Sequence, residues 1–468
     1  MSACEPGAKL IGAQSSVERA EVLRVGVGRR AITPPLGTPC SLGLDDECEQ
    51  IFDTPHVRAL SLANGSGAVC LVAADVIGLQ QRTIAELRAA VAERTGLPKE
   101  AIIAHGTHTH QAPAVHIANN VPLAPYGLHF ADPHYYRFFL EQTALAAQDA
   151  VRSASPARAW VGAGRVEGVA SNRRFVDAAG ALHWRSSRPA AALRELPEGE
   201  IDPFVRVLRF QREAEPQEVL VLNYCCHPTA SGGDEERYVT ADFPGEAMRL
   251  LEEARPGRWC MYFTGPCGDI NPGKHVGDGQ EPEDRIRDVR LLGQRLAQGV
   301  QEALRGMRPA EAALRLARRE VQLPLRADLP TAAELEERLA AAVAEYRAAK
   351  AAGRRLPGGG PVRRLVHLLQ LRAVASGDAI RVEVVALGLA QGVAMAFLPG
   401  ECFLALSREL ARGFQGMLFP VAPTDYSAGY IPTPEAYDQG GYEPQVAVVA
   451  PEAFGVLLAA ASDLLAAL

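Results

Sequence analysis

Hydrophobic and polar positions alternate in several segments of this chain, and the period of the alternation separates strands from helices. A period of two, or a short apolar run, predicts strands at 22–33, 57–79, 101–104, 203–210, 218–224, 258–265, 379–389 and 393–398. Within 57–79, an Asn-Gly pair predicts a turn between two strands. Apolar residues at helical spacing predict helices at 81–97, 135–153, 284–305 and 451–467, and another that opens at 398–401. Thr331 and Glu334 predict a capping box at the start of a helix that runs to about 352.

Strands that alternate with helices predict an α/β fold with a mixed sheet and flanking helices. No linker interrupts the pattern, so we expect a single large domain over 22–468, preceded by a flexible N-terminal arm at 1–21. From about 329 to 374 the composition shifts to Ala, Glu and Arg, which indicates a helical insertion. A solvated pair of surface helices is the favoured interpretation of this insertion, and a lid or an oligomer contact is the alternative. The stretch 421–443 is rich in Tyr, Pro and Gly and is expected to be a loop.

The composition excludes several classes of protein. The 468 residues carry 48 Lys and Arg against 55 Asp and Glu, a net charge of −7, and this acidic balance argues against a nucleic-acid partner. No apolar run reaches the roughly 18 residues of a membrane span, so we expect no stable membrane association. The nine cysteines are scattered without a C-x-x-C pair, and the N-terminus lacks the apolar stretch of a signal peptide. Both observations favour a cytoplasmic protein without a disulfide framework or a thiolate zinc cage.

Histidine is the residue with an unusual distribution, because six of the 11 histidines lie within 105–134. His108 and His110 directly follow the apolar strand 101–104, and in extended backbone both imidazoles would point to the same side of the chain. Imidazole is a common metal ligand and proton carrier. This position after a strand therefore favours a metal site over a hydrogen-bonded surface pair.

Two residues far from this cluster are further candidates. His227 follows the apolar strand 218–224, although a buried core histidine is the more common interpretation of a single imidazole. Glu401 lies where a helix is predicted to start, and a capping carboxylate is the ordinary explanation for a Glu there. Spacing alone therefore indicates a metal site with histidine ligands and leaves the carboxylate and the reaction open.

A series of short motifs runs in order from about 25 to 445, which is nearly the whole chain. They are VGVGRRAIT at 25–33, PHVR at 55–58, a strand that ends in Asp75, HGTHTHQAP at 105–113, SNR at 171–173, HPT at 227–229, GDINP at 268–272, LPGE at 398–401, YSAGYIPT at 426–433 and GYE at 441–443. Together these motifs resemble the catalytic domain of the neutral/alkaline non-lysosomal ceramidases, a family of zinc-dependent amidases. The resemblance implies a single catalytic domain.

The resemblance also implies the ligands of a zinc ion. By position in the motifs they are His108, His227, Glu401 and Tyr430. Two imidazoles and a carboxylate are ordinary ligands of catalytic zinc, whereas a phenolate is unusual.

Three further roles follow from the same resemblance. His110 matches the residue that takes a proton from the zinc-activated water and passes it to the leaving group. Tyr442, twelve residues beyond Tyr430, matches the tyrosine that stabilises the oxyanion. Arg173 matches an arginine that contacts the substrate.

The chain departs from the family pattern at several places. Asn271 stands where the family carries a serine that faces the reacting carbonyl, and an amide can donate a hydrogen bond to an oxyanion but cannot act as a nucleophile. Gln111 and Pro432 replace a serine and a threonine of the motifs. The signal peptide and the immunoglobulin-like domain of the secreted members have no counterpart in this sequence. Ceramide itself is therefore not the expected substrate.

The sequence thus predicts a zinc-dependent amidohydrolase that cleaves the C–N bond of an N-acyl amide in a small soluble or amphipathic molecule. A zinc-dependent esterase, lactonase or lyase on the same scaffold is one alternative, made credible by Asn271, and a non-catalytic zinc-binding relative is another. The expected partner is a small-molecule substrate, and the possibility of a homo-oligomer is left open.

Overall fold

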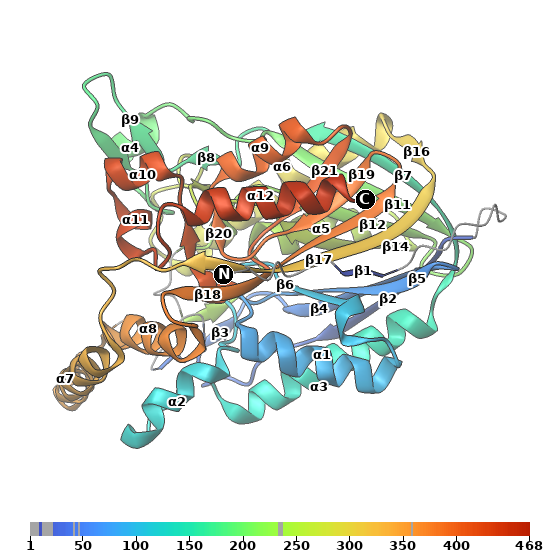
Figure 1. Ribbon diagram of the computed structural model, residues 1–468. Helices are drawn as coiled ribbons and strands as arrows, with labels where there is room; N and C mark the ends of the chain where they lie inside the picture. Colours follow the sequence, from blue (N-terminus) through green and yellow to red (C-terminus); the bar gives the residue numbers. More distant parts are fainter. Residues whose placement is uncertain (1–8, 12–21, 41–42, 45–46, 233–236, 357–358) are drawn as a thin grey trace, which may run out of the picture.

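A large mixed sheet forms the centre of the molecule (Figure 1). The computed structural model describes residues 9–11, 22–40, 43–44, 47–232, 237–356 and 359–468. Within them the large sheet has the strand order β14-β12-β11-β7-β2-β4-β5-β6, and β16 pairs with β7. The pairs β5/β6 and β12/β14 are parallel, and the others are antiparallel. Its strands are β2 (Arg24–Ala31), β4 (His56–Asn64), β5 (Gly67–Ala74), β6 (Ile102–Gly106), β7 (Ser155–Arg165), β11 (Phe204–Arg212), β12 (Glu218–Tyr224), β14 (Arg258–Thr264) and β16 (Arg308–Ala310).

A smaller sheet packs against one face of the large one. Its strands, in the order β1-β17-β18-β19-β21, are β1 (Lys9–Ile11), β17 (Ala312–Pro324), β18 (Ala379–Ala390), β19 (Val393–Phe397) and β21 (Met417–Val421). Side chains of both sheets form one buried cluster, in which Val25 and Val221 of the large sheet join Leu387 and Met395 of the small one. The cluster is apolar throughout, so burial of these inner faces holds the two sheets together.

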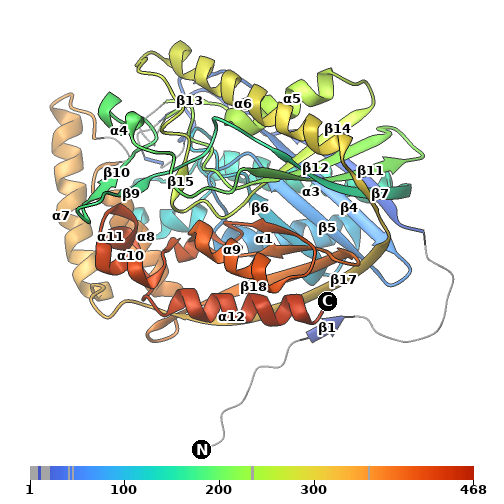
Figure 2. The same cartoon turned by 90° about the horizontal axis from the view of Figure 1, so that it is seen from above.

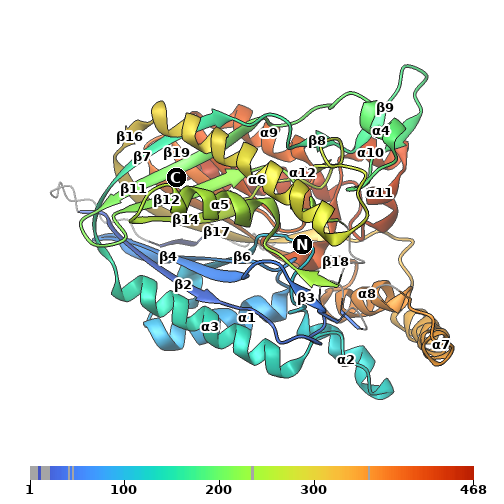
Figure 3. The same cartoon turned by 180° about the vertical axis from the view of Figure 1, so that it is seen from behind.

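Helices cover the two outer faces (Figures 1, 2 and 3). The large sheet is covered by α1 (Gln81–Thr95), α3 (Pro133–Arg152), α5 (Asp242–Glu253) and α6 (Pro282–Arg305). The small sheet is covered by α9 (Leu404–Gly413) and α12 (Ala453–Ala466). The expected α/β fold with a mixed sheet and flanking helices is therefore confirmed, with helices outside and two sheets inside.

The alternation of valine and glycine in β2 explains how α3 reaches the sheet. Val25 and Val27 point into the cluster between the sheets. Gly26 and Gly28 point the other way, where a Cβ atom would lie 1.8 Å from the carbonyl oxygen of Ala150 and 2.0 Å from that of Ala146. Only glycine lets the α3 backbone pack directly on the strand.

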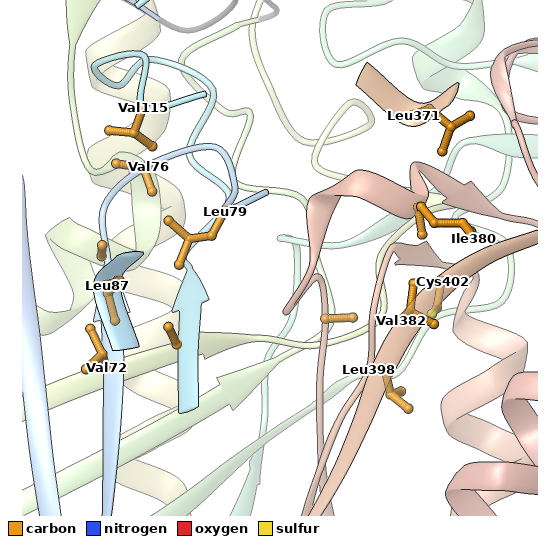
Figure 4. Packing of buried hydrophobic residues seen from close by; sticks show 14 of the residues in the cluster. Val72, Val76, Leu79, Leu87, Val115, Leu371, Ile380, Val382, Leu398 and Cys402 are labelled. Atoms are coloured by element: carbon orange, nitrogen blue, oxygen red, sulfur yellow. The ribbon is translucent and has the colours of Figure 1, made fainter. Parts of the chain in front are cut away.

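The helical insertion consists of α7 (Ala332–Ala351) and α8 (Val362–Val374). The predicted capping box is present, because the Thr331 side chain accepts from the Glu334 N–H and the Glu334 carboxylate accepts from the Thr331 N–H. α7 lies at the edge of the molecule (Figure 2), while α8 packs on α7, α2 (Asn120–Leu123) and β18. Figure 4 shows Leu371 of α8 in the same apolar region as Ile380 and Val382 of β18.

The remaining elements are short. The helices are α4 (Ala191–Glu195), α10 (Pro434–Gln439) and α11 (Tyr442–Val446), and the strands are β3 (Gln50–Ile51), β8 (Ser171–Asn172), β9 (Arg174–Val176), β10 (Leu182–Trp184), β13 (Tyr238–Val239), β15 (Ile270–Asn271), β20 (Glu401–Cys402) and β22 (Tyr430–Ile431). Among the described residues no helix is both long and apolar enough to cross a membrane. The eight cysteines in the described part of the chain are all buried, and none of them forms a disulfide with another.

Several local expectations were wrong. The helix expected at 398–401 begins only at Leu404, because Glu401 and Cys402 pair with β22 as a strand. The stretch 421–443 contains α10 and the first residues of α11 besides its loops. β7 and β17 were not predicted, although they are the longest strands of the two sheets. Most of the expected arm at 1–21 lies outside the described residues, and its described part, β1, pairs with β17.

Candidate metal centre

Three histidines from two strand ends meet in one buried cluster. His108 and His110 follow β6, and His227 follows β12. One ring nitrogen from each of the three lies within 4.8 Å of the others. The cluster could hold a metal ion, and its three members come from the strand ends where the sequence places them.

β6 and β14 form the two edges of the large sheet, yet their carboxyl ends meet at the cluster. The Thr264 N–H donates to Nε2 of His105 over 3.1 Å, and the Nδ1 of that ring lies 3.1 Å from the carbonyl oxygen of Pro423. Burial lowers the pKa of His105 to about 3, so the ring is neutral. His105 is thus a core residue that joins the strand ends, and the part of the histidine cluster that carries chemistry begins at His108.

The backbone at His108 is not extended. Its φ is 71°, in the left-handed region that non-glycine residues seldom adopt, and its N–H donates to the carbonyl oxygen of Val76 over 3.0 Å. The prediction that extended backbone places His108 and His110 on one side is therefore wrong. A turn brings the two rings together, with centroids 5.1 Å apart and planes at 79°.

Glu401 completes the cluster from the far end of the sequence. One carboxylate oxygen, Oε2, lies 3.1 Å from Nε2 of His227 and 3.4 Å from Nε2 of His108. All three side chains are at most 3% exposed. Glu401 is therefore not a helix cap but a member of the histidine cluster.

Backbone carbonyl groups fix the orientation of two of the rings. Nδ1 of His108 lies 2.6 Å from the carbonyl oxygen of Ile77, and Nδ1 of His227 lies 2.5 Å from that of Cys267. A carbonyl oxygen only accepts, so each Nδ1 carries the hydrogen. In a neutral ring Nε2 is then a lone-pair acceptor, and it points toward Glu401. Metal-binding histidines are oriented in this way in proteins.

The charges in the cluster agree with a cation site. Burial lowers the pKa of His227 to about 4, which keeps its ring neutral near pH 7. Burial raises the pKa of Glu401, but the adjacent His108 and His227 rings outweigh this effect and hold the pKa well below its ordinary value, so the carboxylate is negatively charged. Nε2 of His108 is buried and has no hydrogen-bond partner. Two lone pairs and a carboxylate that converge in this way fit a metal ion such as zinc.

Tyr430 lies next to Glu401 because β20 and β22 pair in parallel with these two residues opposite each other. Burial raises the pKa of Tyr430 well above its ordinary value. Its ring makes an edge contact with Tyr442, with centroids 5.9 Å apart. The structure brings the predicted fourth ligand to the site, and its bond to a metal stays a prediction.

Arg173 is held by a buried ion-pair network that the sequence did not indicate. Its Nε lies 2.7 Å from Oε1 of Glu443, a carboxylate with no exposed surface. Nη1 of Arg174 lies 2.7 Å from Oε2, and Nε1 of Trp184 donates to Oε1 over 2.8 Å. The Arg173 guanidinium lies 5.3 Å from the centre of the Tyr430 ring. Glu443 belongs to the GYE motif, so the resemblance was the available signal for it.

Asn271 is fully buried, and its amide serves the local backbone. Nδ2 donates to the carbonyl oxygen of Arg185 over 3.0 Å, and Oδ1 accepts from the Gly273 N–H over 3.0 Å. Only the second hydrogen of Nδ2 is left for another acceptor. The oxyanion role of Asn271 stays a prediction.

A cavity of about 160 Å³ opens beside the cluster. Its wall includes His110, Glu401 and Tyr430 on the side of the cluster, and Tyr442 also lines it. His108 and His227 do not line it. The remaining lining residues are Gln80, His116, Asn119, Phe130, Arg363, Arg364, His367, Leu368, Tyr426, Gly429, Val446 and Val448. A second cavity, of about 720 Å³, lies at α5 and α6 and touches none of the predicted site residues.

Comparison with known proteins identifies the fold. No family model matches the sequence, and no curated protein matches it. The solved structure of neutral ceramidase from Pseudomonas aeruginosa superposes with a TM-score of 0.70 at 18% identity, over 96% of this chain and 74% of that chain. A structure described as ceramidase complexed with C2 superposes with a TM-score of 0.71 at 17% identity, over 96% of this chain and 75% of that chain. The chain therefore has the fold of neutral ceramidase.

Proposed function

We propose that this protein is a zinc-dependent hydrolase that cleaves the C–N bond of an N-acyl amide. The observation that carries the proposal is the convergence of His108, His227 and Glu401, all buried acceptors, beside a cavity. The similarity of the fold to neutral ceramidase supports the amide as the bond type. His108, His227 and Glu401 would hold the metal, with Tyr430 as the fourth ligand. Zinc in such a set supplies a Lewis acid for the scissile carbonyl and makes water nucleophilic near neutral pH.

His110 is the proton carrier in this proposal. It lines the cavity and His108 and His227 do not, which supports this role for it. An imidazole takes a proton from the attacking water and returns it to the leaving nitrogen without large cost near neutral pH. His110 also lies within reach of a metal in the histidine cluster, so its role needs a separate test.

Other residues would stabilise the charge that develops on the carbonyl oxygen. Tyr442 lines the cavity, is 39% exposed, and offers a hydroxyl donor. Asn271 has one amide hydrogen left for the same purpose. Arg173 faces the rings of Tyr430 and Tyr442, which supports a positioning role for it beside the substrate.

The size of the cavity favours a compact substrate. About 160 Å³ lies below the range of roughly 300–1,000 Å³ that is typical of ligand pockets. A small soluble or amphipathic acyl amide therefore fits the proposal better than ceramide with its two long chains.

Three variants of the full-length protein test this function. We expect His108→Ala to lose bound zinc and amide hydrolysis together. His110→Ala should keep zinc and lose turnover by about a hundredfold or more, the usual range for a general acid–base residue. His134→Ala, at an exposed histidine on α3, is the matched control and should change neither property.

Zinc is measured on the purified proteins by mass spectrometry, and turnover on amides and esters with the same acyl group. Full zinc content and activity in His108→Ala would refute the metal assignment. Hydrolysis of the esters alone would favour the esterase or lactonase alternative. Zinc without hydrolysis of either series would favour the non-catalytic relative.

A further inference from the structure

The insertion helix α8 forms one wall of the cavity beside the metal centre. Arg363, Arg364, His367 and Leu368 of α8 line the same cavity as His110 and Glu401. The first three bring nitrogen groups, two of them guanidinium cations, to a pocket that is otherwise lined mainly by aromatic, aliphatic and amide side chains.

The position of α8 is fixed by packing and hydrogen bonds. Val362 and Val366 are fully buried in the core cluster that reaches from α1 to β18. Arg372, in the last turn of α8, donates to the carbonyl oxygens of Leu329 and Pro330. The cavity-lining residues therefore sit on an anchored helix rather than on a loop.

The charges along the cavity are unequally distributed. Among the described residues that line it, Glu401 is the only acidic one, and its carboxylate faces His108 and His227. On the α8 wall Arg364 is exposed, and its Nη2 donates to the carbonyl oxygen of Gln445 over 2.9 Å. Within the described part of the chain Arg364 forms no ion pair, so its charge is not neutralised there.

The positive charges of Arg363 and Arg364 also act on the imidazole of His367, which lines the same cavity. Burial, together with the charges of Arg363 and Arg364, lowers the pKa of His367 to about 4, so this ring is neutral at pH 7. The cavity thus combines one carboxylate, which faces the histidine cluster, with the guanidinium groups of Arg363 and Arg364 on α8. A planar guanidinium binds a carboxylate through paired hydrogen bonds, which makes arginine the usual residue for this purpose.

We propose that the substrate carries a carboxylate, remote from the scissile amide, that binds Arg363 and Arg364. The substrate class is therefore acidic N-acyl amides, such as N-acylated amino acids. The reaction in this inference rests on the proposed function, whereas the anion site rests only on the residues of α8 that line the cavity.

The test compares two small probes that differ only in charge, N-hexanoylglycine and its neutral amide N-hexanoylglycinamide. Hydrogen bonds to a charged group typically change affinity by about tenfold to a hundredfold, so the zinc-loaded enzyme should prefer the acid in kcat/KM by that factor. Arg364→Gln and the double variant with Arg363→Gln should lower this ratio toward one, mainly through KM. Arg338→Gln is the matched control, because Arg338 is an exposed arginine on α7 that does not line the cavity.

A second measurement separates this proposal from the proposed reaction. Binding of both probes to chelator-treated protein is followed by calorimetry, after circular dichroism has shown that protein and variants are folded. Preferential binding of the acid that the double variant loses supports the anion site, even if neither probe is hydrolysed and the amidase assignment fails. Equal binding of both probes by the wild type, or a preference that survives in the double variant, overturns the inference.

Discussion

Glu443 provides the sharpest test of how the site is held together. Its carboxylate is completely buried between the two guanidinium groups of Arg173 and Arg174, at 2.7 Å each, and the indole N–H of Trp184, at 2.8 Å. Burial raises the pKa of Glu443, but the charge of Arg173 and the hydrogen bonds from Trp184 and Arg174 outweigh it and lower the pKa overall. The carboxylate is therefore ionised, and both arginines depend on it for charge compensation.

The substitution Glu443→Gln removes the charge and keeps the shape. Breaking a buried ion pair by removing one partner costs about 3–5 kcal/mol, because the remaining charge is buried without compensation. The glutamine oxygen can still accept from Trp184, which places the expected loss at the lower end, about 3 kcal/mol. Both arginines are only 6% exposed at the side chain, so solvent screens little of this cost.

Urea unfolding followed by circular dichroism measures the loss directly, from the midpoint and slope of the transition. Glu435→Gln is the matched control, because Glu435 is exposed on the neighbouring helix α10 and should change stability by less than about 0.5 kcal/mol. If Glu443→Gln cost less than about 1 kcal/mol, the network would not be the buried, mutually dependent structure that the distances indicate.

Three further predictions concern the fold and its charges. Gly28→Ala should lower the free energy of unfolding by about 1–3 kcal/mol, because its Cβ would meet the α3 backbone. Gly67→Ala, which has open space around it, should have little effect in the same urea assay. Equal effects of the two substitutions would contradict the close approach of α3 to β2. The pKa of His105 in the folded state is lowered from 6.5 to about 3, so the stability that its neutral ring contributes is complete above pH 6.5 and is lost as the pH falls toward 3. Nuclear magnetic resonance should find the His105 ring neutral at pH 5. A protonated ring at that pH would refute its burial. Thr331→Ala removes the capping box of α7 and should cost about 1 kcal/mol in thermal unfolding, while an unchanged stability would show that α7 is held by its packing alone.

The sequence predicted the elements whose pattern is local. The period-two segments became β2, β4, β5 and β11, and the apolar runs became β6, β12 and β14, because side-chain direction in a strand depends only on the neighbouring residues. The histidines predicted at strand ends, His108, His110 and His227, do come together in a group that could hold a metal ion. The same reasoning missed β17, and it placed a helix at Glu401 where pairing with Tyr430 forms a strand instead. At Glu401 the local preference for helix or strand is weak, and pairing with Tyr430, 29 residues further along the chain, makes the segment a strand.

Only the tertiary structure decided which residues come together in the candidate metal centre. His108, His227 and Glu401 are separated by more than a hundred positions each, and they meet because the edges β6 and β14 close on each other and β20 pairs with β22. The resemblance to a known family assigned their roles, whereas no spacing rule could. Glu443 as the anchor of Arg173, and α8 as the cationic wall, came from packing alone. The sequence by itself determined the strands, the histidines at their ends and the average composition of a globular protein. Distances between far segments depend on how layers pack, which is a property of the whole chain and not of any stretch of it.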